Sequence, residues 1–316
     1  MALYRTYSDY LKEKYNEKVY KIPIALPVTC PNRDGTLDSD GCIFCGSIRA
    51  DYETKAVRME ITRQIDRSIS HVGPKYKAKK FIAYFLNFTN TYMPLSRFRY
   101  CVEEACGHPD IVGLAVSTRP DCIHESYLEA LREAQGKYGT NITVELGLQS
   151  VNPHTLLKIG RCHTVAEFID AALQIGRYHF DLCAHIIADL PWDDRIDVEE
   201  AAKLVSVLPV TEIKIHSLYI IKGTKLAKMY EKGDIKLLPP EEYAERVVLI
   251  LSMLRPDIVV QRIVGRASAN TLSVNGGRPW WEVKEYIEKL MRNRHIQQGS
   301  ACNYLHGAAV RRFLHE

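Results

Sequence analysis

Three cysteines near the start of the chain have the types and spacing of ligands for an iron–sulfur cluster. In the run TCPNRDGTLDSDGCIFC, Cys42 and Cys45 form a C-x-aromatic-C pair, and eleven residues separate Cys30 from Cys42. A fully protein-ligated [4Fe–4S] cluster takes four thiolates. The sequence offers no obvious fourth ligand nearby. We therefore expect this trio to leave one iron open, as catalytic metal sites leave a position for a small molecule.

Two other kinds of site could be built from the same thiols. A C-x-x-C pair lowers a thiol pKa in thioredoxin-like redox sites. A structural zinc site would need a histidine from elsewhere to complete its four ligands. The remaining six cysteines form no close C-x-x-C pair and predict no second cluster. One of them, Cys183, lies in an apolar run, where a free thiol behaves as a small hydrophobe.

The elements that must position these thiols follow an alternating pattern. Short apolar runs alternate with helical periodicity, which is typical of βα units around a parallel sheet. The expected strands are 22–28, 81–86, 111–117, 142–148, 182–188, 212–218 and 258–263. The expected helices are 61–70, 96–106, 123–135, 165–178, 198–208, 224–232 and 241–254. The pattern predicts an α/β fold, a partial TIM-like (β/α)6 barrel with a C-terminal α-helical extension. A doubly wound sheet shares the alternation and is the alternative.

Polar strings follow several of the expected strands. NFTNTY follows the second strand, STRPDC the third and LQS the fourth. Helix capping and turns explain a share of these residues. Their concentration at the carboxyl ends of successive parallel strands nevertheless favours a ligand site at that edge.

The composition is that of an ordinary globular protein, with 25% charged and 46% hydrophobic residues. No apolar stretch approaches the roughly 20 residues that cross a bilayer, and the polar N-terminus has no secretory h-region. These features predict a cytoplasmic protein without a membrane partner, in which nine cysteines are not expected to form disulfides. A net charge of +4 permits an anionic partner. We expect an N-terminal helical extension (1–20), a barrel (21–265) and a C-terminal cap or substrate-binding extension (266–316).

Taken together, these motifs resemble the radical SAM superfamily. CPNRDGT, GCIFC, YFLNFTNTYMP, STRPDC, ELGLQS, KIGRCHT and KIHSLYIIKGT are similar to its YhcC-like branch, the MnmL group, which is related to the radical SAM domain of the Elongator catalytic subunit. The resemblance implies two cofactors, a [4Fe–4S] cluster and S-adenosylmethionine (SAM). It further implies that Cys30, Cys42 and Cys45 ligate three irons while SAM chelates the fourth. Reductive cleavage of SAM would give a 5′-deoxyadenosyl radical that abstracts hydrogen from substrate, with a reductant such as flavodoxin or ferredoxin.

The resemblance also implies SAM-binding residues. Phe44 would pack over the cluster and the adenine edge, Asn90 stands where relatives hold the methionyl amine, and Arg161 matches the arginine that relatives aim at the SAM carboxylate. A solvated helix-start arginine is the alternative for Arg161. The other expected contacts from the barrel strands are Ser117, Glu145, Gln149 and His185.

The strand positions Glu145, Gln149 and His185 can also be judged from strand geometry and residue type. Glu145 and Gln149 are four apart in one strand and should share a face, and a satisfied core histidine is the alternative for His185. The chain departs from its relatives at Asp189–Asp194, where they carry a Gly-Leu-Pro-Gly-Glu turn. The adenine-side loop is therefore expected to differ in shape.

The substrate implied by the YhcC-like branch is tRNA. Some members are linked to the wobble uridine, where a carboxymethylaminomethyl group at C5 is trimmed to aminomethyl. The C-terminal part of the chain is basic and aromatic, which suits phosphates and unpaired bases; its residues of this kind are Arg262, Arg266, Arg278, Arg292, Arg294, Arg311 and Arg312, with Trp280, Trp281 and His295. Solvated helix faces and a packed tryptophan pair are the alternative interpretation. The alternatives are radical chemistry on a small metabolite or peptide and, from another class, a non-catalytic iron–sulfur regulator or electron-transfer protein.

Overall fold

Seven parallel strands form one strongly curved sheet in the computed structural model, which describes residues 2–46, 59–266 and 270–313. The strands are β1 (Val19–Ile24), β2 (Lys80–Phe85), β3 (Ile111–Thr118), β4 (Asn141–Gln149), β5 (Asp181–Ile187), β6 (Glu212–His216) and β8 (Val259–Arg262). Their spatial order is β1-β2-β3-β4-β5-β6-β8, and every neighbouring pair is parallel. This order has no reversal point, so the doubly wound alternative is wrong and the predicted partial barrel is confirmed.

Curvature brings the two edges of the sheet close together. Thr6, just before the first helix, makes a parallel bridge to Val260 on β8. Lys21 on β1 donates to Gln261 on β8 over 3.4 Å. The sheet therefore wraps around a lumen on its concave side.

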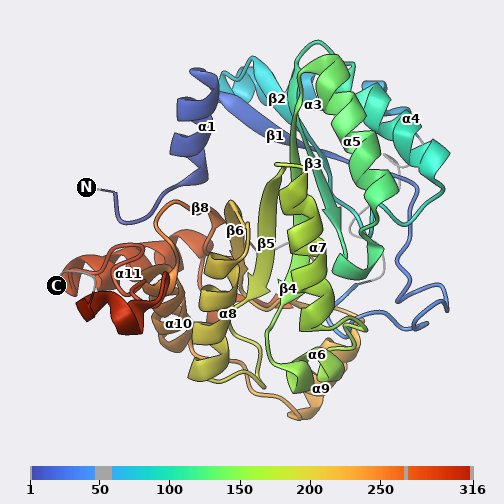
Figure 1. Cartoon of the computed structure of the whole chain (residues 1–316). Coiled ribbons are helices and arrows are strands. Elements are labelled where there is room, and N and C mark those ends of the chain that lie inside the picture. The colour runs from blue at the N-terminus through green and yellow to red at the C-terminus, as the bar shows by residue number, and fades with distance from the viewer. Residues whose placement is uncertain (1, 47–58, 267–269, 314–316) are drawn as a thin grey trace.

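Helices cover the convex side of the sheet (Figure 1). The helices close to their predicted ranges are α3 (Ile61–Tyr76), α4 (Leu95–Cys106), α5 (Glu125–Tyr138), α7 (Val165–Arg177), α8 (Arg195–Val207) and α10 (Pro240–Met253), together with α9 (Lys225–Lys232), which contacts β7 (Ile220–Ile221) and lies beside α6 (Pro153–Lys158). The pattern did not predict α6 or the two-stranded antiparallel sheet of β7 and β9 (Thr271–Ser273). A C-terminal helix, α11 (Trp280–Asn293), packs beside α10 (Figure 1).

Alternation along each strand separates the core from the lumen. On β4, Ile142, Val144, Leu146 and Leu148 belong to the main hydrophobic core under the helices. Glu145 points to the other face, where it contacts side chains from β1, β5 and β6. Because successive strand side chains point to opposite faces, the same segment builds an apolar core outside and a polar lumen inside.

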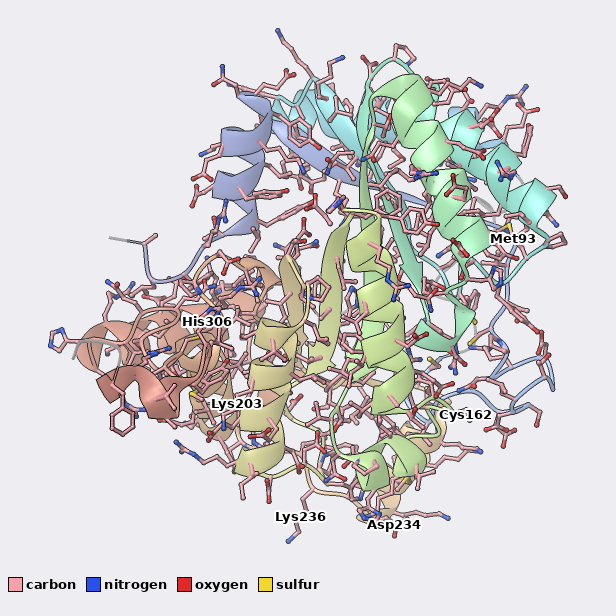
Figure 2. The ribbon with its side chains drawn as sticks, viewed as in Figure 1. Met93, Cys162, Lys203, Asp234, Lys236 and His306 are labelled. Atoms are coloured by element: carbon pink, nitrogen blue, oxygen red, sulfur yellow. The ribbon has the colours of Figure 1, made fainter. Side chains whose placement is uncertain are left out.

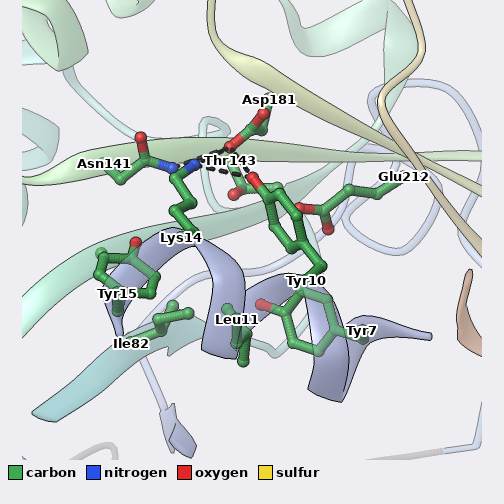
Figure 3. Close-up of a pocket in the computed structure, with 11 residues that line it drawn as sticks. Tyr7, Tyr10, Leu11, Lys14, Tyr15, Ile82, Asn141, Thr143, Asp181 and Glu212 are labelled. Atoms are coloured by element: carbon green, nitrogen blue, oxygen red, sulfur yellow. Dashed lines mark hydrogen bonds and ion pairs between the residues drawn. The ribbon is translucent and has the colours of Figure 1, made fainter. Parts of the chain in front are cut away.

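Helix α1 (Tyr7–Tyr15) closes the lumen at the amino ends of the strands. Figure 3 shows Lys14 and Tyr10 of α1 reaching Asp181, which accepts from them over 2.8 and 3.2 Å, and from Asn141 over 2.8 Å. The space that remains there is about 10 Å³, no more than one water molecule needs. The lumen is thus closed at this end, which leaves the carboxyl ends of the strands as the place for a site.

The division of the chain into 1–20, 21–265 and 266–316 stays a prediction. Within the described residues, none of the helices has the length and apolar character that a bilayer span requires.

Candidate active site

The cysteine loop, residues 25–46, follows β1 at the carboxyl ends of the strands. Its first turn is held by a bond from the Arg33 amide to the Cys30 carbonyl (2.8 Å), and its last by one from the Cys45 amide to the Cys42 carbonyl (2.8 Å). The Ile43 amide also donates to the Ile159 carbonyl over 3.0 Å. These backbone bonds fix the loop against the segment between α6 and α7.

Cys42 lies in a buried, electropositive setting. The Nη1 of Arg161 lies 3.7 Å from its sulfur, and the Nδ2 of Asn32 lies 3.6 Å away. A hydrogen bond from Cys45, together with the charge of Arg161, lowers the pKa of the Cys42 thiol to about 5 despite its burial. The same hydrogen bond raises the pKa of Cys45, so the pair holds one proton between two sulfurs. The thiolate is the form that binds metal.

The three sulfurs of the cysteine loop are not all close enough together to share one metal ion. Zinc–sulfur bonds of about 2.3 Å keep two thiolates on one zinc within about 4.6 Å of each other. Among the described residues, the only three His, Cys, Asp or Glu ligand atoms that all lie within 4.8 Å belong to Glu145, Cys183 and His185. A cubane binds each thiolate through a different iron, so the donor set of the cysteine loop fits a [4Fe–4S] cluster.

Buried polar atoms without a hydrogen-bond partner in the described structure gather around the same loop. Arg119, on the segment after β3, binds Asp121 through Nε (2.8 Å) and Nη2 (2.7 Å), while its buried Nη1 has no partner. The Nε of Arg161 and the Oδ1 atoms of Asn32 and Asn90 are likewise buried without a hydrogen-bond partner. Such atoms are rare in proteins and call for a ligand or water. Sequence reasoning missed Arg119, although it stands in the polar string STRPDC.

The structure gives each of the residues Asn90, Phe44 and Arg161, which were predicted to contact SAM, a different set of neighbours. Asn90 is buried and donates to the carbonyls of Phe85 (2.9 Å) and Ser117 (2.8 Å), which ties the ends of β2 and β3 together. Phe44 packs against the small apolar cluster of α6, β7 and α9. Arg161 is buried and donates to the Gly147 carbonyl over 3.0 Å, so the alternative of a solvated arginine is wrong.

Gln149 lies nearer the rim of the lumen than Glu145 does. A register shift between Gly147 and Gln149, with Gln149 at a φ of 71°, breaks the alternation at the end of β4. The Gln149 amide folds back over Gly147, where its nitrogen would lie only 2.6 Å from a Cβ on that glycine. Gln149 therefore lies at the rim beside Arg161, while Glu145 lies inside the lumen.

Glu145 is the centre of a charged network in the lumen. It is fully buried, forms an ion pair with Lys21, and accepts from Lys214 over 2.5 Å and from His185 over 3.0 Å. Burial favours its neutral form, but the charges of Lys21 and Lys214 outweigh burial and hold its pKa well below the usual range. The aromatic ring of Tyr84 lies between the lysines, 4.4 and 4.5 Å from their ammonium groups. Because two cations already bind this carboxylate, the group formed with Cys183 and His185 is a poor metal site.

His185 is part of this network rather than of the apolar core. Burial and the charge of Lys214 lower its pKa to about 4, so it is neutral at pH 7. Sequence reasoning missed Lys21, Lys214 and Tyr84. Polar residues at period two within apolar strands were the available signal.

The segment that departs from the expected glycine turn is rigidly tied down. Asp189 accepts from the Leu218 amide over 2.6 Å, and burial raises its pKa to about 7. Asp194 caps α8 in a reciprocal capping box with Asp197. In place of the glycines of the relatives, the carboxylates of Asp189 and Asp194 therefore hold this turn in its conformation.

Comparison with known proteins identifies the family. A model described as the Radical SAM superfamily matches residues 29–205, and one described as the Radical_SAM C-terminal domain matches 210–293. The chain belongs to the radical SAM superfamily. Radical SAM enzymes use a [4Fe–4S] cluster and SAM, which confirms the predicted cofactors.

Two proteins of similar sequence and one of similar structure show which radical SAM proteins this chain resembles. It is 34% identical to the uncharacterized protein YtqA of Bacillus subtilis, covering 94% of this chain and 92% of YtqA. It is 31% identical to protein YhcC of Escherichia coli K12, covering 92% and 93%. The archaeal Methanocaldococcus infernus Elp3 has the same fold, with a TM-score of 0.61, 17% identity, and coverage of 89% of this chain and 64% of that one. The predicted YhcC-like, Elongator-related branch is confirmed.

Proposed function

We propose that this radical SAM enzyme modifies the wobble uridine of tRNA, trimming a carboxymethylaminomethyl group at C5 to aminomethyl. The observation that carries the radical chemistry is the cysteine loop at the carboxyl ends of the strands, where the lowered pKa of the buried Cys42 thiol and the unpartnered nitrogens of Arg119 and Arg161 occur together. The relation to Elp3 and the basic surface described below support the RNA substrate.

In this proposal Cys30, Cys42 and Cys45 hold the cluster. When bound, the cluster and SAM supply a 5′-deoxyadenosyl radical that abstracts hydrogen from substrate. Arg161 and Asn32 keep Cys42 oriented and electrostatically stabilise its thiolate. The unpartnered Nη1 of Arg119 adds a donor beside the same loop, since the charges of Cys30 and Cys42 act on this guanidinium.

The proposed SAM contacts divide into two groups. Those at the rim are Phe44, Asn90, Gln149 and Arg161, whereas Ser117 pairs in register with Glu145 and its side chain bonds to Tyr84 inside the lumen. Glu145 and His185, by contrast, bind each other and the lysines within the lumen, so we now place them on the substrate side. Helix α1 closes the lumen below them and keeps bulk water from the reacting carbon, which a carbon radical requires.

The C-terminal arginines give less support to RNA binding than their number suggested. Arg278 binds Glu241 over 2.6 Å, Arg292 binds Glu288 over 3.9 Å, and Arg294 makes two bonds of 2.6 Å to Glu245. Paired guanidiniums have less charge to offer a phosphate. Arg262 lies in the lumen instead of on the surface.

A different surface combines unpaired charge with aromatic rings. Lys75 in the last turn of α3 and Lys77 and Lys79 after it are exposed, and none forms an ion pair with an acidic side chain among the described residues. Tyr76 stacks on Tyr20 with ring centroids 4.4 Å apart. The hydrogen bond of Tyr20 and the charges of Lys75 and Arg266 lower the pKa of Tyr76, which places these groups together.

Arg266 extends this surface towards α11. Its guanidinium lies 4.3 Å from the centre of the Trp280 ring, next to Trp281, which is 56% exposed. We call this set the basic-aromatic surface: Tyr20, Lys75, Tyr76, Lys77, Lys79, Arg266, Trp280 and Trp281. Cations suit phosphates and exposed rings suit unpaired bases.

Nucleoside mass spectrometry of tRNA tests the proposal. A deletion strain should accumulate 5-carboxymethylaminomethyluridine, and the wild-type gene should restore aminomethyluridine, whereas a Cys42→Ala gene should not. An unchanged modification profile in the deletion strain would exclude the tRNA reaction. A small metabolite or peptide would then be the substrate class to pursue.

A further inference from the structure

The lumen carries more positive than negative charge. Lys21 on β1, Lys214 on β6 and Arg262 at the end of β8 all project into it. Opposite them stand Glu145 and Glu212, and burial raises the pKa of Glu212 to about 7, so its charge is only partial at neutral pH. Lys14 and Asp181 at the amino end of the lumen pair with each other, so the remaining three cations face at most two anions. A buried excess charge is costly unless a counter-charge binds.

Arg262 is the cation without a carboxylate partner in the described part of the chain. Its Nη2 lies 2.5 Å from Nδ1 of His216, and its Nε is buried with no hydrogen-bond partner. The two lysines, in contrast, are both satisfied by Glu145. A guanidinium that donates to a neutral imidazole retains its full charge, and it has several N–H groups left to donate.

The histidines beside Arg262 form an ordered chain of donors. Arg262 donates to Nδ1 of His216, whose Nε2 lies 3.3 Å from Nδ1 of His185. His185 in turn donates from Nε2 to Glu145 over 3.0 Å. One tautomer of each ring satisfies all three contacts, so Arg262 is held in place without losing its charge. This chain fixes an arginine but leaves its counter-anion to come from outside.

We propose that Arg262, supported by Lys214 and His216, binds a carboxylate of the substrate. A carboxylate matches the planar fork of a guanidinium through two parallel bonds. The inference rests on the proposed function, in which the group removed from uridine is a carboxymethyl group. The aminomethyl product lacks the carboxylate, so no negative charge offsets its ammonium and this cationic site repels it. The same residues thus select substrate and favour release of product.

The test uses anaerobically reconstituted enzyme and an anticodon stem-loop carrying 5-carboxymethylaminomethyluridine, with the methyl ester of the same stem-loop as the neutral analogue. Wild-type enzyme should bind the acid more tightly than the ester. Arg262→Gln should weaken binding of the acid by about 30-fold or more and remove the preference for the acid over the ester. Arg262→Lys keeps the charge but loses the planar guanidinium, so its affinity for the acid should lie between those of wild type and Arg262→Gln. Arg278→Gln, a surface arginine paired with Glu241, is the matched control and should behave as wild type.

Two further measurements, of SAM affinity and of stabilisation by acetate, distinguish a wrong carboxylate site from a wrong tRNA reaction. The affinity for SAM without RNA should be the same in wild type and Arg262→Gln; a matching loss of SAM affinity would assign the anion to SAM and overturn the proposal. Acetate titrated at constant ionic strength should raise the Tm of wild type more than that of Arg262→Gln. Equal shifts in both proteins would overturn the carboxylate site. Turnover of the stem-loop reports on the proposed function alone, so its absence with a positive acetate result would reject the tRNA reaction and keep the anion site.

Discussion

The guanidinium of Arg161 lies 3.7 Å from the sulfur of Cys42. These residues are far apart in sequence and come from the loop after β1 and the segment between α6 and α7. The contact joins the cysteine loop to the rim of β4, because Arg161 also donates to the Gly147 carbonyl. A cluster held by this loop would therefore be fixed relative to the strands that line the lumen.

Removal of a proposed cluster ligand should abolish the cofactor. Cys42→Ala is expected to lose the iron and sulfide of the reconstituted protein and to form no 5′-deoxyadenosine from SAM with dithionite. Cys101→Ala is the control, since Cys101 is a buried thiol on α4 in the main hydrophobic core. Iron analysis and chromatography of the products measure both effects. A Cys42→Ala protein with a full cluster would refute the ligand assignment.

The proton shared by the cysteine pair should be visible in the iron-free protein. The pKa of Cys42 is lowered to about 5, with the hydrogen bond of Cys45 as the largest cause and Arg161 as a further one. The thiolate is therefore present at pH 7 and is protonated as the pH falls through about 5. Ultraviolet thiolate absorbance should show one step there, absent in Cys42→Ala and moved to higher pH in Cys45→Ala and Arg161→Gln. A wild-type step only above pH 8 would contradict this prediction.

Neutralising Glu145 should destabilise the fold. Glu145→Gln leaves Lys21 and Lys214 buried without their counter-charge, at a cost of about 3–5 kcal/mol. Because the folded pKa of Glu145 lies below its unfolded value of 4.5, the wild-type advantage is full above that pH and is lost as the pH falls through the folded pKa. Urea denaturation of both proteins between pH 7 and pH 3 measures the difference. A constant difference across this range would exclude the ion pairs as its source.

Reversing charge on the basic-aromatic surface should weaken tRNA binding. Lys75→Glu with Lys79→Glu removes two exposed cations, so the slope of log affinity against log salt should fall by roughly 0.7–0.9 per lost phosphate contact. SAM cleavage without RNA should not change. Lys203→Glu on α8 is a control whose lysine already pairs with Glu199 and Glu200. Identical salt slopes for wild type and the double variant would place the RNA elsewhere.

The sequence predicted those features that depend on local pattern. The apolar runs and helical periods placed the strands of the sheet, and the spacing of Cys30, Cys42 and Cys45 singled out the loop. Period two predicted one face for Glu145 and Gln149 but not the positive φ of Gln149, which ends the regular strand and folds its side-chain amide back over Gly147. Helix-period reasoning also overlooked α6, which is only six residues long.

Long-range pairing could not be predicted from the sequence. Nothing in the local pattern reveals that Lys21 and Lys214, from the first and sixth strands, meet at Glu145. Arg262 was counted among surface cations because arginine is usually exposed, whereas the curvature of the sheet turns it towards His216. Such contacts depend on the closure of the barrel, which the sequence specifies only through the whole fold.

Electron paramagnetic resonance of the reduced, reconstituted protein, recorded before and after SAM is added, tests the central claim most directly. The account predicts the signal of a reduced [4Fe–4S] cluster that changes when SAM binds to its open iron, accompanied by formation of 5′-deoxyadenosine. A protein with no cubane signal, or with a cluster whose signal is indifferent to SAM, would contradict it.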